Sequence, residues 1–242
     1  MPNLMLSSSG WLVAGIPGVS CAVPYDDGMS QPVPVPAKPK ERLIVYVDGF
    51  NLYHGMHQEF GRSTLWLDLV ALAQSFRPQQ RLVAVKYFSA PVLDDPRAQG
   101  RQAHYIEALA ALYPNQFSAI MGRYQKKDIV CFKCGNSHVH YEEKETDVNI
   151  AVTLVADAAL HSMDSAIIVS ADSDLVPAVK AVGSIGAHLF VAAAFPPNRV
   201  SQHLKTLMPA SFHIDRKRIK KLQLPPSFAA GGKNFNRPAR WA

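Results

Sequence analysis

Four aspartates stand beside predicted strands or helices and could together bind a divalent cation. Asp48 follows an apolar run in "RLIVYVDGFNLYHG", Asp147 opens a helical pattern in "KETDVNIAV", and Asp172 and Asp174 follow a second apolar run in "IIVSADSDLVPAV". Gathered carboxylates repel one another, but Mg²⁺ or Mn²⁺ prefers oxygen ligands and would offset that repulsion. Such an ion activates a bound water and polarises a phosphoryl oxygen. The acids therefore predict a metal-binding cleft suited to cleaving phosphodiesters.

The residues around these acids could complete the cleft. Asn51 could supply a neutral amide that orients a ligand, and His54 could line a wall. Each acid also has a simpler interpretation, because Asp48 belongs to an Asp-Gly pair that is common in turns, and Asp172 or Asp174 could cap a helix. We favour the metal cleft for the set, since separate elements would deliver acids to one place.

Strand and helix patterns alternate along residues 42–215, which predicts an α/β fold with a mainly parallel sheet and helices on both faces. Apolar runs predict strands over residues 42–47, 81–92, 117–125, 165–171 and 187–195. Helical spacing predicts helices over residues 63–76, 94–113, 146–161, 173–185 and 198–208. We expect a Ser-Thr pair to cap the first helix and Thr146 to cap the third. Because function gathers at the carboxyl ends of parallel strands, this order would bring the acids to one edge.

A hairpin insertion is predicted over about residues 128–143, with "KCGN" as its turn. Cys131 and Cys134, followed by His138 and His140, could hold a structural zinc ion with tetrahedral geometry. Their spacing is too tight for the common finger with two cysteines and two histidines. The alternative is a hairpin with two free thiols.

The two flanks differ from the body in composition. Residues 1–41 are rich in Ser, Gly and Pro and predict a flexible Pro-rich extension, with Met29 as an alternative start. Residues 216–242 hold eight Lys or Arg and no acid, so the net charge of +6 belongs to this segment. We expect a basic, disordered tail that could attract phosphate.

Composition bears on where the protein works. No apolar run reaches the about 20 residues that a membrane span needs. The first 37 residues contain no Lys or Arg, which argues against a secretory signal. The three cysteines are too few for a disulfide framework. The sequence therefore predicts a cytoplasmic protein without membrane association.

The three segments "YVDGFNLYHG", "KETDVNIAV" and "IIVSADSDLVPAV" together resemble the NYN branch of the PIN-like nuclease superfamily, over about residues 42–215. The resemblance implies a PIN-like (Rossmannoid) sheet and RNA cleavage with Mg²⁺ or Mn²⁺. It also implies that the metal site is built on Asp48, Asp147, Asp172 and Asp174, with Asn51 and Ser170 nearby.

One position departs from the pattern of the family. Many relatives carry another acid about two turns into the second motif helix, where this chain has Thr153. The next acid, Asp157, falls on a different turn. The number of metal ions and the catalytic competence of the site therefore depend on the remaining acids.

Three functions are compatible with these patterns. The first is a metal-dependent ribonuclease acting on RNA. The second is an NADH-dependent monooxygenase that hydroxylates a small pyridine in nicotine degradation, as a bacterial member of the same family does. A G-x-G-x-x-G fingerprint would support a dinucleotide site, and the sequence contains none. The third is an inactive PIN-like domain that only binds RNA or a partner protein.

We expect the purified protein to contain about one zinc ion per chain, bound by Cys131 and Cys134 together with His138 or His140. The double variant Cys131→Ser, Cys134→Ser loses this zinc because both thiolate ligands are gone. Metal analysis by mass spectrometry measures the zinc content of each protein. Wild-type protein that is folded and free of zinc would contradict the prediction.

Overall fold

The computed structural model describes residues 39–93, 95–130 and 132–242. The predicted Pro-rich extension lies outside the described residues, apart from residues 39–41, which are exposed and have no regular structure.

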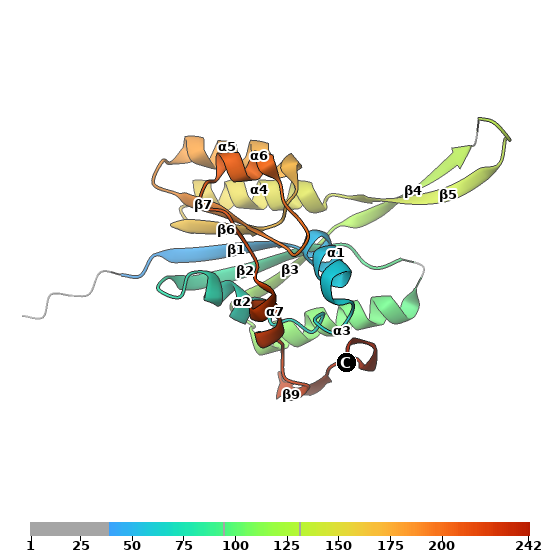
Figure 1. Cartoon of the computed structure of the whole chain (residues 1–242), viewed down its shortest axis with the longest axis horizontal. Helices are drawn as coiled ribbons and strands as arrows, with labels where there is room; N and C mark the ends of the chain where they lie inside the picture. The colour runs from blue at the N-terminus through green and yellow to red at the C-terminus, as the bar shows by residue number, and fades with distance from the viewer. Residues whose placement is uncertain (1–38, 94, 131) are drawn as a thin grey trace, which may run out of the picture. The chain divides into compact units, whose positions relative to one another are not determined.

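A six-stranded sheet forms the centre of the described part of the chain (Figure 1). The strands lie in the order β3-β2-β1-β6-β7-β8, and every neighbouring pair is parallel. They are β1 (Arg42–Asp48), β2 (Arg81–Ser89), β3 (Phe117–Met121), β6 (Ser165–Val169), β7 (Phe190–Phe195) and β8 (Phe212–His213). The predicted α/β architecture is therefore confirmed.

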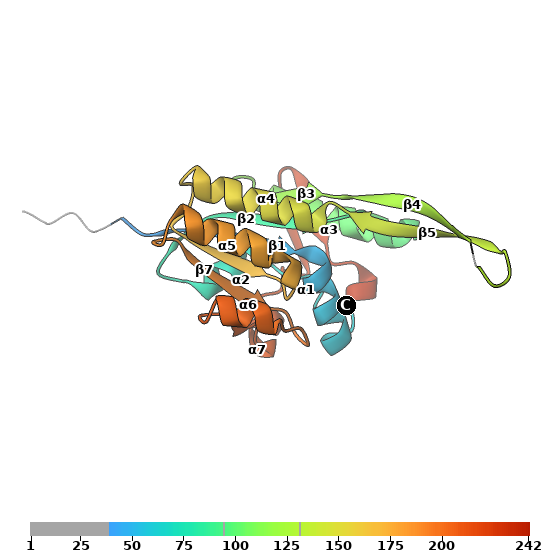
Figure 2. The ribbon, with the colours of Figure 1, turned by 90° about the horizontal axis from the view of Figure 1, so that it is seen from above.

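Helices cover both faces of this sheet, as Figures 1 and 2 show. One face packs against α1 (Gly49–Phe60), α2 (Leu69–Phe76), α3 (Pro96–Leu112) and α7 (Arg216–Lys221). The other packs against α4 (Thr146–Ala159), α5 (Val176–Ile185), which follows a 3-10 turn at Ser173–Leu175, and α6 (Gln202–Leu207). Within the described part of the chain, none of the helices is long and apolar enough to cross a membrane.

Strand β1 shows why the sheet needs continuous apolar runs. Leu43, Val45 and Val47 lie in the core beneath α1, α2 and α3. Ile44 and Tyr46 lie in the core on the opposite face. Side chains alternate between the faces of a strand, and here helices cover both faces, so no position in the interior of β1 is free to be polar.

Helix α1 was not predicted, because two glycines lower its intrinsic helical propensity. The structure explains both glycines by close packing. A Cβ atom at Gly49 would lie 2.6 Å from the carbonyl oxygen of Phe88, and one at Gly55 would lie 2.5 Å from that of Pro197. The side chain of Asp48 caps the first turn of the helix. The close packing of α1 against β2 and the loop after β7 therefore explains why these two positions are glycine, although glycine lowers helical propensity.

Two predicted element boundaries were wrong for local reasons. Asp68, and not the Ser-Thr pair at residues 63–64, caps α2, because its carboxylate accepts hydrogen bonds from two backbone amides in the first turn. The strand predicted over residues 117–125 divides at Gly122 into β3 and a separate strand, β4 (Arg123–Val130).

Strands β4 and β5 (Ser137–Lys144) form an antiparallel ribbon that extends away from the central sheet (Figures 1 and 2). The ladder is longer than the insertion predicted over residues 128–143. Cys134 is exposed. Cys131 lies outside the described residues, as do the side chains of His138 and His140, so the zinc site stays a prediction.

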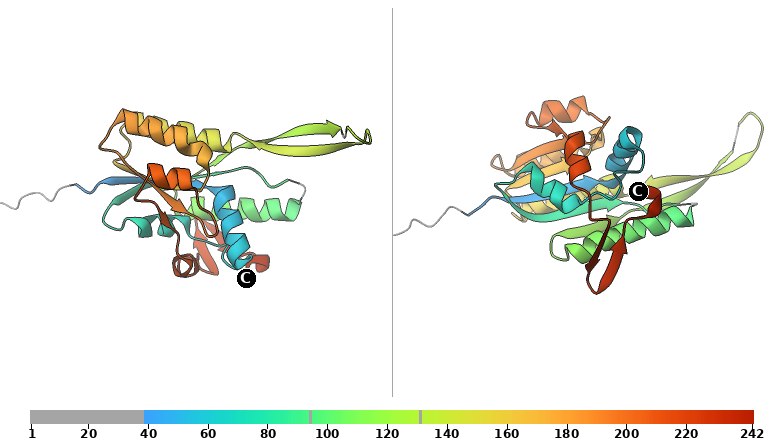
Figure 3. Two further views of the ribbon diagram at one scale, coloured as in Figure 1. Left: turned by 45° about the horizontal axis from the view of Figure 1, so that its top comes forward. Right: turned by 60° about the horizontal axis from the view of Figure 1, so that its bottom comes forward.

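The prediction that residues 216–242 form a disordered tail is wrong. This segment contains α7, the antiparallel strands β9 (Ser227–Ala230) and β10 (Lys233–Asn236), and a 3-10 turn at Ala239–Trp241. Figure 3 shows the segment passing alongside α3. The compact unit runs from Pro39 to Ala242, so the predicted boundary at residue 215 falls inside it.

An aromatic cluster holds this segment in place. Phe235 and Trp241 are 2% and 8% exposed, and the indole of Trp241 packs against Trp66 and Tyr105. The indole N–H of Trp66 donates to the carbonyl oxygen of Pro225 at 2.9 Å. The apolar residues of the segment show no period, because several of them pack on partners that lie far away in the sequence.

We expect Phe235→Ala to lower the free energy of unfolding by about 3–5 kcal/mol, because the ring is buried against Phe228 and His104. Urea unfolding measures this change. The control is Lys220→Ala, an exposed side chain in the same segment, with an expected change within about 0.5 kcal/mol. Equal stability of Phe235→Ala and wild type would show that this segment does not contribute to the core.

Candidate functional site

The predicted site residues gather at the carboxyl edge of the sheet, where the strand order reverses. Strand β1 lies between β2 and β6, and the chain leaves β1 and β6 toward different helices. Open α/β sheets bind ligands in the crevice at this point. The register pairs Val47 with Val169, so Asp48 and Ser170 are neighbours at the ends of their strands.

Hydrogen bonds fix the Asp48 carboxylate, which is 3% exposed. One oxygen accepts from the backbone N–H of Asn51 at 2.9 Å, and the other accepts from the Ser170 hydroxyl at 2.8 Å. The Ser170 oxygen in turn accepts from the N–H of Asp172 at 3.0 Å. The side-chain oxygen of Asn51 accepts from the N–H of Ala171 at 3.2 Å. These bonds join α1 to the loop after β6.

Asp147 reaches the site from the first turn of α4. Thr146 was predicted to cap this helix, but Thr146 is its first residue, and the preceding Glu145 has a left-handed backbone with φ 81°. Glu143 satisfies the exposed helix terminus instead, because its carboxylate accepts from the N–H of Thr146 at 3.1 Å and from the Thr146 hydroxyl. The predicted start of the helix at Thr146 is confirmed. The predicted cap is wrong, because the carboxylate of Glu143 accepts the hydrogen bond from the helix terminus.

A cleft of about 240 Å³ brings most of these groups together. Its walls include five predicted residues, namely Asp48, Asn51, His54, Asp147 and Asp172, and also Phe50, Glu143 and Arg199. Ser170 is fully buried behind Asp48. Asp174 is exposed and does not line the cleft, although its N–H donates to the Asp172 carboxylate at 2.9 Å.

The cleft holds more negative charge than its surroundings compensate. Burial raises the pKa of Asp48 above its usual range, and its hydrogen bonds only partly oppose this. Burial and then repulsion by Asp172, Asp48, Glu143 and Asp174 raise the pKa of Asp147 to about 6. A helix N-terminus normally favours an ionised carboxylate by less than about 1 kcal/mol. Desolvation and like charge outweigh the helix dipole here.

Arg199 supplies a positive charge to the same cleft. One of its terminal nitrogens donates to the side-chain oxygen of Gln58 at 3.3 Å. Its Nε is buried and has no hydrogen-bond partner among the described residues. The guanidinium group of Arg199 is therefore the positive charge of the cleft that suits an anionic ligand such as phosphate. Burial, Arg199 and His57 lower the pKa of His54, which keeps that imidazole neutral near pH 7.

The donor set fits a hard cation that keeps part of its water shell. Asp48, Asp147, Asp172 and Asn51 all offer oxygen ligands. Across the described residues, no three His, Cys, Asp or Glu side chains are arranged so that they could hold a metal ion together. Mg²⁺ usually retains several waters and binds through one or two carboxylates, so it does not require such a cage.

Sequence reasoning missed Glu143 and Arg199, although each has a recognisable signal. Arg199 follows β7 at the same carboxyl edge as the aspartates, so the rule that located Asp48 also applies to it. Glu143 stands three residues before Thr146, a spacing that lets its carboxylate reach the first amide of α4.

Asp157, the acid that departs from the family spacing, belongs to the core and not to the cleft. Its carboxylate accepts from the hydroxyl of Tyr46 and pairs with the ammonium of Lys86, both at 2.6 Å. Both partners come from the sheet, so Asp157 fastens α4 to β1 and β2. Neither Asp157 nor Thr153 lines the cleft.

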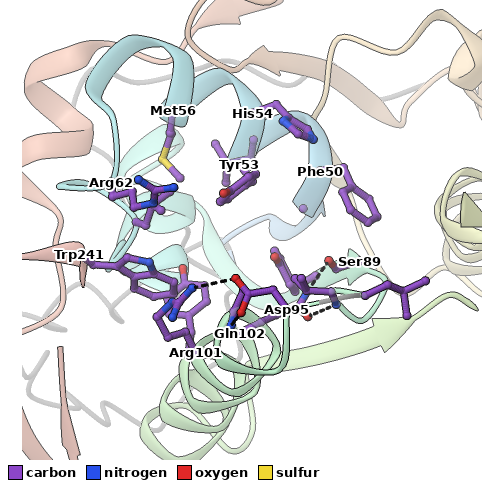
Figure 4. Close-up of a pocket in the computed structure, with 18 of the residues that line it drawn as sticks. Phe50, Tyr53, His54, Met56, Arg62, Ser89, Asp95, Arg101, Gln102 and Trp241 are labelled. Atoms are coloured by element: carbon purple, nitrogen blue, oxygen red, sulfur yellow. Dashed lines mark hydrogen bonds and ion pairs between the residues drawn. The ribbon is translucent and has the colours of Figure 1, made fainter. Parts of the chain in front are cut away.

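A second, larger cavity of about 420 Å³ adjoins the acidic cleft (Figure 4). Phe50 and His54 line both spaces. The walls of the second cavity are mainly apolar and aromatic, with several arginines.

Comparison with protein families identifies residues 42–213 as an NYN domain. The match covers most of the chain and includes all the residues that line the acidic cleft.

Two relatives were also found. The chain is 26% identical over 239 residues to 6-hydroxy-3-succinoylpyridine 3-monooxygenase HspA of Pseudomonas putida, covering 83% of this chain and 75% of that protein. A crystal structure of a protein of unknown function from Vibrio parahaemolyticus is similar with a TM-score of 0.49 and 20% identity, over 75% of this chain and 98% of that one.

We expect Asp147→Asn to stabilise the metal-free protein at pH 7 by about 1 kcal/mol, after allowance for solvent screening of this half-buried group. The folded pKa of about 6 exceeds the usual 3.8, so ionisation opposes folding. The free energy of unfolding of the wild type, relative to that of the variant, therefore falls as pH rises from about 4 to 6. Near pH 4 the difference between the two proteins disappears. Urea unfolding in EDTA at both pH values measures this.

Asp164→Asn is the matched control, because the pKa of Asp164 is lowered to about 2 by hydrogen bonds from Arg42. Its ionised form favours folding, so removing it destabilises the protein at pH 7. If both variants are destabilised at pH 7, the Asp147 carboxylate is structural.

Proposed function

The chain belongs to the NYN domain family, and we propose that it is a divalent-metal-dependent ribonuclease that cleaves RNA phosphodiester bonds in the acidic cleft. NYN domains are PIN-like and nuclease-like, which supports an enzyme of this kind. The observation that carries the proposal is the convergence of Asp48, Asp147 and Asp172 on one cleft, beside the amide of Asn51.

The cofactor in this proposal is Mg²⁺ or Mn²⁺. One or two of Asp48, Asp147 and Asp172 would bind it directly and the others through its water shell, and the exposed Asp174 would add negative charge nearby. When bound, the ion activates a water and polarises a phosphoryl oxygen. Support comes from the raised pKa values of Asp48 and Asp147, because carboxylates under mutual repulsion bind a cation that relieves it.

The side chains of the cleft have separate tasks. Arg199 binds a phosphate oxygen of the RNA through its guanidinium group, which lines the cleft. Asn51 uses its side-chain oxygen on the N–H of Ala171, which leaves its two amide hydrogens for the substrate. Ser170 holds Asp48 in one orientation. Asp147 releases its proton when the cation binds, because its pKa is about 6 in the metal-free protein and a nearby cation favours the ionised carboxylate.

A structural zinc ion is a separate proposal, with Cys131, Cys134, His138 and His140 as ligands. It rests on the sequence spacing and on the β4–β5 ladder, which carries this segment at its far end. The zinc would stabilise the ribbon and would take no part in cleavage.

The second candidate function is NADH-dependent hydroxylation of 6-hydroxy-3-succinoylpyridine, as in nicotine degradation. The name of the Pseudomonas putida relative and the mainly apolar cavity of about 420 Å³ favour it, since the cavity has the size of a small-molecule site. The third candidate is an inactive domain that binds RNA or a partner protein.

We expect wild-type protein to cleave a labelled single-stranded RNA with Mn²⁺ and to melt at a higher temperature when Mn²⁺ is added. Asp48→Asn and Asp172→Asn each lower the cleavage rate by on the order of 100-fold, because each removes a ligand oxygen. Both variants also lose the shift in melting temperature. Gel analysis of the RNA and calorimetry measure these effects.

Asp164→Asn serves as the control, because this acid pairs with Arg42 at the opposite edge of the sheet. It should keep cleavage activity while losing up to about 1 kcal/mol of stability. Wild-type protein without Mn²⁺-dependent stabilisation or cleavage contradicts the ribonuclease. NADH oxidation that depends on the pyridine would then support the hydroxylase.

A further inference from the structure

The cavity of about 420 Å³ has walls from several separate parts of the chain. Helix α1 contributes Phe50 and Tyr53, and α3 contributes Arg101. The β4–β5 ribbon contributes Tyr141, and the 3-10 turn after β10 contributes Arg240. Figure 4 shows the α1 and α3 side chains facing one another across this space.

Exposed aromatic rings make the walls suited to a flat ligand. Tyr53 and Tyr141 line the cavity, yet they are 40% and 41% exposed. The Tyr53 ring is already stacked on His57, with centroids 5.6 Å apart and an interplanar angle of 19°. A ring held in this way stacks on a base with little further loss of side-chain entropy.

Positive charge surrounds these rings. Arg62, Arg101 and Arg240 line the cavity, and Asp95 is the acid that lines it. Asp95 pairs with Arg101 at 3.8 Å. Among the described residues, no carboxylate lies within ion-pair distance of Arg62 or Arg240. Asp95 interacts with Arg240 only at longer range, where the charge of Arg240 adds to the backbone hydrogen bond that lowers the pKa of Asp95. The cavity thus has more guanidinium groups than carboxylates, and guanidinium suits phosphate.

The position of the cavity links it to the acidic cleft. Phe50 and His54 line both spaces, so the two spaces are neighbours. The acidic cleft offers oxygen ligands and Arg199, which suit a phosphodiester. The larger cavity offers rings and arginines, which suit a base with its phosphate. Along a single nucleic-acid strand, a base with its phosphate is followed by the next phosphodiester, so one strand could place suitable groups in both spaces.

We propose that the larger cavity binds one unpaired nucleotide of the RNA, next to the phosphodiester held in the acidic cleft. The base stacks on Tyr53 or Tyr141, and the phosphate of that nucleotide pairs with Arg62 and Arg240. This inference rests on the proposed ribonuclease function. It adds a place for the neighbouring base, which must be unpaired because a base within a duplex cannot leave its stack to enter the cavity without a cost.

Equilibrium binding without metal tests the cavity separately from cleavage. The probe is a short single-stranded RNA that carries one 2-aminopurine, whose fluorescence falls when the base stacks. In EDTA, wild-type full-length protein should quench the probe on binding. Tyr53→Ala should reduce the quench, and the double variant Arg62→Gln, Arg240→Gln should weaken binding about 10-fold. The double variant Arg97→Gln, Lys220→Gln is the control, because both side chains are exposed and lie outside the cavity. Its two substitutions remove the same amount of positive charge.

The outcomes separate this inference from the ribonuclease proposal. An equal loss of affinity in the two double variants shows general attraction of phosphate, and it overturns the nucleotide site. Cleavage with an unchanged KM in Arg62→Gln, Arg240→Gln overturns it too. Quenching that depends on the cavity, in protein that never cleaves RNA with Mn²⁺, supports the site and rejects the ribonuclease. A further outcome is that the double variant Arg62→Gln, Arg240→Gln loses binding of 4-hydroxybenzoate and keeps its affinity for RNA. That result would show that the cavity binds a small aromatic acid, and it would overturn the nucleotide site.

Discussion

The buried carboxylate of Asp48 is the group on which the rest of the site depends. It ends the apolar strand β1, and burial alone would drive it toward the protonated form. Two donors oppose this, the N–H of Asn51 and the hydroxyl of Ser170. One bond begins α1 and the other ties β1 to the loop after β6. A single ionised side chain therefore sets the first turn of a helix, the distance between two loops and the base of the cleft.

Two acids of the cleft have a structural role and are also placed for a functional one. Asp48 caps α1, and Asp172 caps the 3-10 turn that leads into α5. Both carboxylates also line the cleft. Capping uses the oxygens that face the helix amides and leaves each carboxylate with further lone pairs. An acid that satisfies a helix terminus at the carboxyl edge of a parallel sheet is thus already placed for a ligand.

The segment after residue 215 contributes both to the core and to the wall of the larger cavity. The Trp241 indole packs in the cluster around Trp66 and Tyr105, and this packing places Arg240 at the larger cavity. Tyr105 also donates its hydroxyl to the carbonyl oxygen of Leu67 at 2.6 Å, so the cluster is fastened to the backbone before α2. Loss of this packing would remove a cavity wall as well as core contacts. The segment is therefore part of the domain and not an appendage.

The sequence by itself determined the elements that carry strong local signals. The apolar runs of β1, β2, β6 and β7 predicted a parallel sheet, because strands buried on both faces need such runs. Their order placed Asp48, Asp147 and Asp172 at one edge, since parallel strands share their carboxyl ends. Only the tertiary structure decided the rest. Helix α1 depends on what Gly49 and Gly55 touch, and the order of residues 216–242 depends on a distant aromatic surface. Glu143 and Arg199 have local signals of position, but only the tertiary structure shows that both side chains line the same cleft.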